Sequence, residues 1–258
     1  MDHFYRRAFW RLKLFICMAF AFLFSISSAA ETNKHLRLGI DDFPPYTMQH
    51  GERRGYVVDI VTETYQLAGY SVEVVFLPWK RALLKVEEKQ LDGVIAAYVT
   101  DDRKNFLSFS EFSVDTHVLF AKLKNRPIKF TSLEDLSSYK IGVLKGSAHF
   151  EGDFYDAEYL DKQVIRSHEQ ALKLLMKQRF DLLVSQKVIL DYTINTELPS
   201  LKGEIEYLSP NIVNMKAFHA IGKHRADHRE LLNSFDEAFK KLKANGRYQE
   251  ILFEYGIE

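Results

Sequence analysis

Short apolar runs alternate with segments of helical periodicity in the part of the chain that follows residue 35. The predicted strands are Leu36 to Ile40, Ser71 to Phe76 and Leu91 to Tyr98, because each is a short, mainly apolar run. Between them, Gly55 to Ala68 and Trp79 to Glu88 carry apolar residues at helical spacing. This order predicts an α/β fold with a parallel sheet that binds ligands at the carboxyl ends of its strands.

The alternation restarts after residue 115 and closes with helices. The further predicted strands are Val118 to Ala121, Lys140 to Leu144, Val164-Ile165, Phe180 to Val184 and Ala217 to Ile221. The further predicted helices are Leu133 to Leu136, Glu169 to Lys177, Val188 to Asn195, Arg225 to Ala244 and Tyr248 to Tyr255. Two such units suggest one domain inserted into another: residues 31–114 and 215–258 form a first lobe and residues 115–214 a second. The crossings are expected near Glu111 to His117 and Ile212 to Lys216.

The first thirty residues have the pattern of a secretion signal. Arg6, Arg7, Arg11 and Lys13 precede an apolar run, Leu14 to Phe24, which is short for a membrane span. Small residues follow at Ser28-Ala29-Ala30, so we expect cleavage after Ala30 and a periplasmic protein. The alternative is an uncleaved amino-terminal anchor.

Composition narrows the classes of function. The leader contains the only cysteine, Cys17, so the mature chain has no disulfide or thiolate chemistry. It also contains four of the 35 basic residues and one of the 35 acidic ones, which leaves a formal net charge of −3. A slightly acidic chain is a poor partner for nucleic acid. We predict no cofactor and no metal site, since the histidines lack ligand spacing and His219 lies in an apolar strand.

One arginine stands out as candidate chemistry. Arg103 lies in the polar turn Thr100-Asp101-Asp102-Arg103, directly after the third predicted strand. A guanidinium there lies at a sheet edge where ligands bind, and its planar fork matches a carboxylate. The alternative is an inert surface arginine.

Three other places could contribute to a site. Phe43 and Tyr46 flank two prolines after the first strand, where they could wall a small ligand or plug the core. Trp79 begins a helix beside Arg81 and could line a cleft or pack on the core. The backbone amides of Ser147 and Ala148, after Gly146, could face an anion, or the segment could be a plain turn.

The ordered motifs resemble the periplasmic solute-binding proteins of family 3, which deliver polar amino acids to ABC importers. The resemblance covers essentially residues 36–256 and rests on Lys89 to Gly93, Thr100 to Arg103, Phe109-Ser110, Ser132 to Leu136, Lys145 to Ser147 and Gly246 to Leu252. It implies a two-lobed type II binding-protein fold, with two mixed sheets flanked by helices. A ligand would be clamped between the lobes by hinge closure.

The resemblance also implies roles for single residues. Arg103 would bind the ligand α-carboxylate, assisted by Thr100 or by a backbone group near Tyr98. The residues that would line the rest of the site are Phe43, Tyr46, Trp79, Gly146, Ser147, Ala148 and Gln186. Gln186 occupies a position where family members usually carry an aspartate for the ligand ammonium. A neutral amide accepts a hydrogen bond but leaves a buried ammonium without a counter-charge.

These observations favour a monomeric binding protein for a small carboxylate-bearing solute, an amino acid or a related compound, that serves an ABC permease. A sensor that reports ligand occupancy to a membrane partner is the first alternative. A dehydratase-like enzyme on the same scaffold is the second, with Glu73, Glu111 or Asp115 as the general acid. The absence of any catalytic motif in the sequence favours a protein that is not an enzyme.

Overall fold

The structure is a computed structural model that describes residues 34–145 and 153–257. The fold lies in the unit Leu36–Glu258. The predicted leader and the turn Gly146 to Ala148 lie outside the described residues.

The elements follow the order that the hydrophobic pattern predicts. The strands are β1 His35–Ile40, β2 Ser71–Phe76, β3 Gly93–Tyr98, β4 Leu107–Leu123, β5 Lys140–Leu144, β6 Asp161–Ile165, β7 Leu182–Gln186, β8 Ile205–Tyr207 and β9 Val213–Gly222. The helices are α2 Tyr56–Leu67, α3 Trp79–Glu87, α4 Asp101–Phe106, η1 Leu133–Leu136, α5 Asp153–Asp156, α6 His168–Met176, α7 Lys187–Thr196, η3 Pro199–Leu201, α8 His228–Ala244 and α9 Arg247–Glu254.

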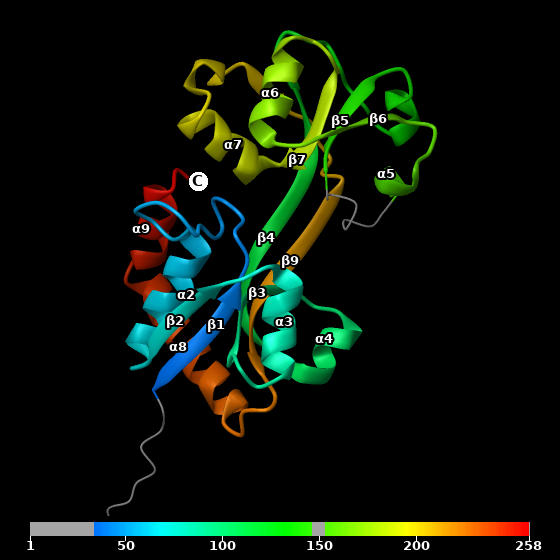
Figure 1. Cartoon of the computed structure of the whole chain (residues 1–258). Coiled ribbons are helices and arrows are strands. Elements are labelled where there is room, and N and C mark those ends of the chain that lie inside the picture. The colour runs from blue at the N-terminus through cyan, green and yellow to red at the C-terminus, as the bar shows by residue number, and fades with distance from the viewer. Residues whose placement is uncertain (1–33, 146–152, 258) are drawn as a thin grey trace, which may run out of the picture. The chain divides into compact units, whose positions relative to one another are not determined.

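In the described residues, the strands form one mixed sheet in the order β2-β1-β3-β9-β4-β7-β5-β6, with β8 paired to β4. β1 is parallel to β3, and β5 is parallel to both β6 and β7. β9 is antiparallel to β3 and β4, and β4 is antiparallel to β7. Figure 1 shows α2, α8 and α9 on one side of the β1–β3 strands and α3 and α4 on the other. The predicted α/β class, with helices flanking mixed strands, is confirmed.

Two long strands join what the sequence suggested were two separate sheets. β4 and β9 pair from Leu107–Gly222 to Val118–Val213, across both stretches where we expected short crossings between the lobes. Phe112, Val114, Thr116 and Val118 are buried and alternate with less buried polar residues, the period of a strand with one covered face. The two halves are therefore connected by hydrogen-bonded strands as well as by the chain.

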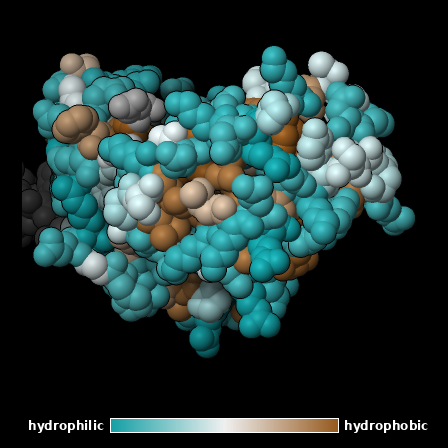
Figure 2. Space-filling view, turned by 90° about the horizontal axis from the view of Figure 1, so that it is seen from above, coloured by the Kyte–Doolittle hydropathy of each residue, from teal (hydrophilic) through white to brown (hydrophobic). Residues whose placement is uncertain are grey.

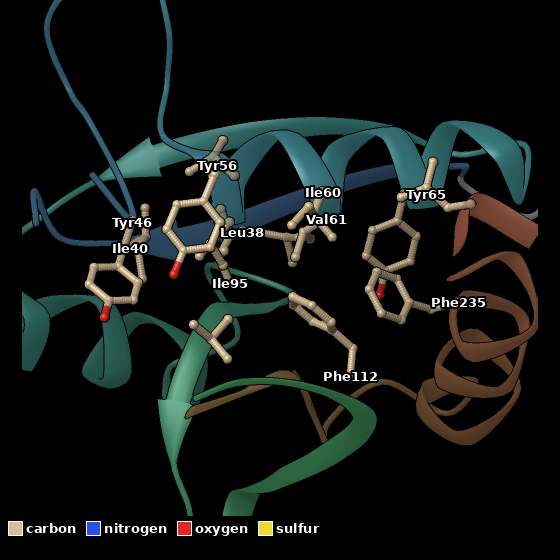
Figure 3. Close-up of a cluster of buried hydrophobic side chains, with 14 of the residues drawn as sticks. Leu38, Ile40, Tyr46, Tyr56, Ile60, Val61, Tyr65, Ile95, Phe112 and Phe235 are labelled. Carbon is tan, nitrogen blue, oxygen red and sulfur yellow. The ribbon is translucent and has the colours of Figure 1, made fainter. Parts of the chain in front are cut away.

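Separate hydrophobic clusters form on the two halves of the sheet. The cluster in Figure 3 packs α2 and α8 against β1 and β3, with Tyr46 and Tyr56 at one end and Tyr65 and Phe235 at the other. In the other half, Leu182 and Val184 face one cluster while Leu183 faces a second. β7 is thus buried on both faces, as expected for a central strand covered by helices.

The Leu-Asp-Gly motif before β3 has a structural explanation. The Asp92 carboxylate accepts bonds from the Arg37 backbone at 2.7 Å and from Arg225 Nη1 at 2.6 Å. Gly93 lies so close to β9 that a Cβ would stand 2.2 Å from the Ala220 carbonyl oxygen. The motif therefore holds β1, β3 and β9 in close contact.

The surface is mainly polar. On the face seen in Figure 2, hydrophilic residues cover most of the surface and hydrophobic residues gather near its middle. No helix within residues 34–145 and 153–257 combines the length and apolar character needed to cross a membrane.

Candidate functional site

The turn that carries Arg103 is the first turn of a short helix. Thr100 is the N-cap of α4, and its Oγ1 accepts the Arg103 backbone N–H at 3.3 Å. Asp101 and Asp102 occupy the first turn, where acidic residues are favoured, and Lys104 bonds to Asp101 at 2.9 Å. The Thr100 hydroxyl thus fixes the backbone that carries Arg103.

The Arg103 guanidinium has two contacts in the described part of the chain. Its Nη1 donates to the Tyr98 carbonyl oxygen at 2.8 Å, and its Cζ lies 5.2 Å from the centre of the Trp79 ring. No described carboxylate is within ion-pair distance of it. The side chain is partly buried, and this burial lowers the pKa of Arg103 from its usual value. The site is a partly desolvated cation without a counter-charge among the described residues. We call Trp79, Tyr98, Thr100 and Arg103 the Arg103 cluster.

Trp79 is held in place by the start of α3. Pro78 is the N-cap and Trp79 the first helical residue, while Ala82 and Val86 on the same helix are buried. The Trp79 side chain packs partly against the hydrophobic clusters on both sides of the sheet. Arg81, in the same first turn of α3, is exposed.

Phe43 and Tyr46 have different environments. Their rings stack with centres 5.7 Å apart, but Phe43 is 39% exposed and Tyr46 only 7%. Tyr46 also packs on Tyr56 at 5.2 Å, so it belongs to the core. Thr47 closes the loop, because its Oγ1 donates to the Asp41 carbonyl at 2.7 Å and accepts from the Phe43 backbone at 3.0 Å. Phe43 is the ring that remains available at the surface.

Hydroxyl groups connect this loop to the Arg103 cluster. The Tyr98 hydroxyl lies 3.5 Å from Oγ1 of the buried Thr116, and the Tyr46 phenol lies near enough to both residues for them to influence its pKa. Burial raises the pKa values of Tyr46 and Tyr98, so both phenols are neutral donors at neutral pH. The structure therefore brings together six of the predicted residues, Arg103, Thr100, Tyr98, Trp79, Tyr46 and Phe43.

The predicted residues of the other half are only partly placed. Gln186 ends β7 and caps α7, where it is 3% exposed, and its Oε1 has no hydrogen-bond partner among the described residues. Gly146, Ser147 and Ala148 lie outside the described residues. Within the described chain, no hydrogen bond, ion pair or ring contact joins Gln186 to the Arg103 cluster.

Comparison with known proteins identifies the family. The model of the bacterial extracellular solute-binding proteins, family 3, matches residues 36–258. The chain belongs to this family. A relative in family 3 is the arginine-binding extracellular protein ArtP of Bacillus subtilis (strain 168), 26% identical over 243 residues, which cover 91% of this chain and 92% of the relative. The predicted resemblance is thereby confirmed.

Solved structures confirm the type II binding-protein fold. An ancestral cationic amino acid solute-binding protein matches with a TM-score of 0.68 at 21% identity, over 86% of this chain and 95% of that one. A histidine kinase sensor domain with similarity to periplasmic binding proteins matches with a TM-score of 0.61 at 21% identity and the same coverages. Family 3 proteins are binding proteins, and these likenesses support the fold.

A cavity of about 620 Å³ in this family 3 protein lies apart from Arg103. Among the predicted site residues that the structure describes, only Tyr46 lines it, together with residues of β4, α7, β8 and the carboxyl-terminal segment. Several of its charged groups have partners: Asp191 accepts from Lys187 at 2.6 Å and from the Tyr207 hydroxyl, and Asp115 lies 3.6 Å from Lys216. Apart from Tyr46 and Asp115, none of these lining residues is a candidate from the sequence, although the period-two pattern of β4 places His117 on the exposed face beside Asp115.

The three carboxylates considered for an enzyme are exposed. Glu73 pairs with Arg37 at 2.9 Å, Glu111 lies 3.8 Å from Lys240, and Asp115 lies 3.6 Å from Lys216. A general acid usually requires burial or a special neighbour to shift its pKa, and these surface pairs supply neither. Within the described residues there is also no group of three or more His, Cys, Asp or Glu side chains that could hold a metal ion.

Proposed function

We propose that this family 3 protein binds a small solute through its carboxylate, an amino acid or a related compound, and delivers it to an ABC importer. The observation that carries the proposal is the Arg103 guanidinium, which is partly buried, fixed on one face and without a described carboxylate partner. A desolvated cation gains most from an anionic ligand, and its fork favours a carboxylate. The arginine-binding relative supports an amino-acid ligand.

The proposed binding cycle uses both lobes. Residues 31–114 and 215–258 carry the Arg103 cluster, with Phe43 as an exposed wall. Residues 115–214 would close over the ligand by a hinge motion, bringing Gly146, Ser147, Ala148 and Gln186 to it. The unpartnered Gln186 Oε1 would accept a hydrogen bond from the ligand. A leader cleaved after Ala30 would place the protein in the periplasm.

A thermal-shift panel of amino acids, dicarboxylates and small peptides, followed by calorimetry, tests the binding step. A carboxylate ligand at about a hundredfold excess over its Kd should stabilise the fold by about 2.7 kcal/mol.

Arg103→Met should weaken the affinity for that ligand by a hundredfold or more, on the order of 3 kcal/mol, because a charge-assisted bidentate contact is lost. The matched control is Arg81→Met, which removes an exposed arginine nearby and should leave affinity unchanged. Equal affinity of Arg103→Met and wild type would refute the site.

The delivery step has its own test. Uptake of the radiolabelled ligand should fall when the gene is deleted and recover with the wild-type chain but not with Arg103→Met. Unchanged uptake, together with a lost transcriptional response to the ligand, would instead support the sensor alternative.

A further inference from the structure

Arg103 is held at three points in the described structure, one on its backbone and two on its guanidinium. Thr100 Oγ1 accepts its backbone N–H, the Tyr98 carbonyl accepts from Nη1 at 2.8 Å, and the Trp79 ring lies 5.2 Å from Cζ. No described group accepts a hydrogen bond from Nε or Nη2. The edge formed by these two nitrogens is therefore the open side of the fork, and a carboxylate binds two such parallel donors.

The indole ring is anchored independently of Arg103. Trp79 is the first residue of α3 and packs partly into two hydrophobic clusters, so the ring is anchored by its own helix and by the core. A guanidinium over an indole face is attracted by the ring quadrupole, and more strongly when water is partly excluded. Stacking also fixes the plane of the guanidinium, which the single bond to Tyr98 does not.

We propose that Trp79 is a positioning residue that acts through Arg103, setting the plane in which the open Nε–Nη2 edge meets a carboxylate. The inference rests on the proposed function, in which Arg103 binds the carboxylate. It differs from the expectation that Trp79 only walls a pocket, because one face of the indole is already covered by the guanidinium. A long flexible side chain that is ordered before binding loses less entropy when the ligand arrives.

Two probes separate positioning from pocket lining. L-Arginine carries the carboxylate, and L-argininamide keeps the same side chain but replaces the carboxylate with an amide. Trp79→Leu, which keeps apolar bulk without a π face, should weaken L-arginine about tenfold, whereas Trp79→Phe, which keeps a π face, should stay within about threefold of wild type. Neither variant should change L-argininamide affinity more than about twofold, since that probe has no carboxylate for the fork.

The outcomes distinguish this inference from the proposed function. Equal losses for both probes in Trp79→Leu would make Trp79 a pocket wall and overturn the inference, while a selective loss of L-arginine in Arg103→Met would still support the carboxylate site. Unchanged L-arginine affinity in Arg103→Met would overturn both. A wild-type protein that binds neither probe would also overturn the inference.

A double-mutant cycle of melting temperatures, measured without ligand, tests the stacking of Arg103 on Trp79. The Tm loss caused by Trp79→Leu should be smaller in an Arg103→Met background than in the wild type, because the second substitution has already removed the stack. Strictly additive Tm losses would mean that the two side chains do not interact and would overturn the inference.

Discussion

His219 shows how the fold fixes the protonation state of a single residue. The side chain is fully buried, with Nδ1 3.0 Å from the Val94 carbonyl and Nε2 2.8 Å from the Tyr65 hydroxyl. A carbonyl only accepts, so Nδ1 carries the hydrogen, and Nε2 accepts from the hydroxyl. Both nitrogens of the neutral ring are satisfied. A second proton, on Nε2, would remove the acceptor of the Tyr65 hydroxyl hydrogen bond. It would also place a positive charge in the core.

The buried His219 should make the free energy of unfolding sensitive to acid. Burial lowers the pKa of His219 from 6.5 to about 4, so above pH 6.5 the ring is neutral in both the folded and unfolded states and contributes no pH dependence. As pH falls from 6.5 towards 4, His219 takes up a proton in the unfolded chain but not in the folded chain. The free energy of unfolding therefore falls by about 3 kcal/mol over this range. Urea unfolding across this range, referenced to each protein at pH 8, should show a flatter profile for His219→Gln. His50→Gln, at an exposed position, should follow the wild type, and an unchanged slope in His219→Gln would contradict the prediction.

At the residue scale, the sequence indicated where the candidate side chains lie along the elements but left open how they touch. Arg103 and Trp79 each follow from their position at the end of a strand or the start of a helix. Their stacking does not, because it joins residues distant in the chain and depends on side-chain rotamers. Tyr46 shows the same limit, since a core ring and a pocket ring have the same sequence pattern, and the structure places it in the core at 7% exposure.

Elements with strong periodicity were predicted well, and the misses have local causes. α2, α3 and β2 match their predicted ranges within a residue or two, because each has a clear apolar period and a glycine or proline at its boundary. α4 was missed since a helix this short has no apolar face to reveal it. The middle of β4 was missed because its exposed Asp115 and His117 resemble a polar crossing until the alternation with Val114 and Thr116 is counted.

The close approach of β3 and β9 predicts a large effect at Gly93. In Gly93→Ala the new Cβ would stand 2.2 Å from the Ala220 carbonyl oxygen, and only a separation of the two strands relieves a contact with backbone. We expect a loss of about 3 kcal/mol in urea unfolding, at the upper end of overpacking effects. Gly203→Ala is the control, since no atom lies within 4 Å of its Cβ and its positive φ alone should cost about 1 kcal/mol. Equal losses at the two positions would show that the β3–β9 spacing is not tight.

On the scale of the whole molecule, the two proposed lobes share more than a pair of strands. Ile189, on α7 of the second lobe, is 4% exposed and belongs to the same hydrophobic cluster as Tyr46 and Phe112 of the first. β4 and β9 run through both halves. A hinge motion that opens the proposed ligand site must therefore bend these strands and either keep or break the contact of α7. The same links should make the two halves unfold together.

Cooperative unfolding can be followed with two probes in a Trp10→Phe background. Trp79 is then the only tryptophan and reports the first lobe, while far-ultraviolet circular dichroism reports both. We expect coincident urea transitions, as for a two-state chain.

Ile189→Ala should lower the free energy of unfolding by about 3 kcal/mol, because a cavity opens where the lobes meet. The urea midpoints of both signals should therefore fall together. Val164→Ala removes the same kind of apolar group from a side chain that is 71% exposed and should have little effect. If Ile189→Ala instead shifted the dichroism while the fluorescence transition stayed in place, the lobes would be independent units and the contact of α7 would not couple them.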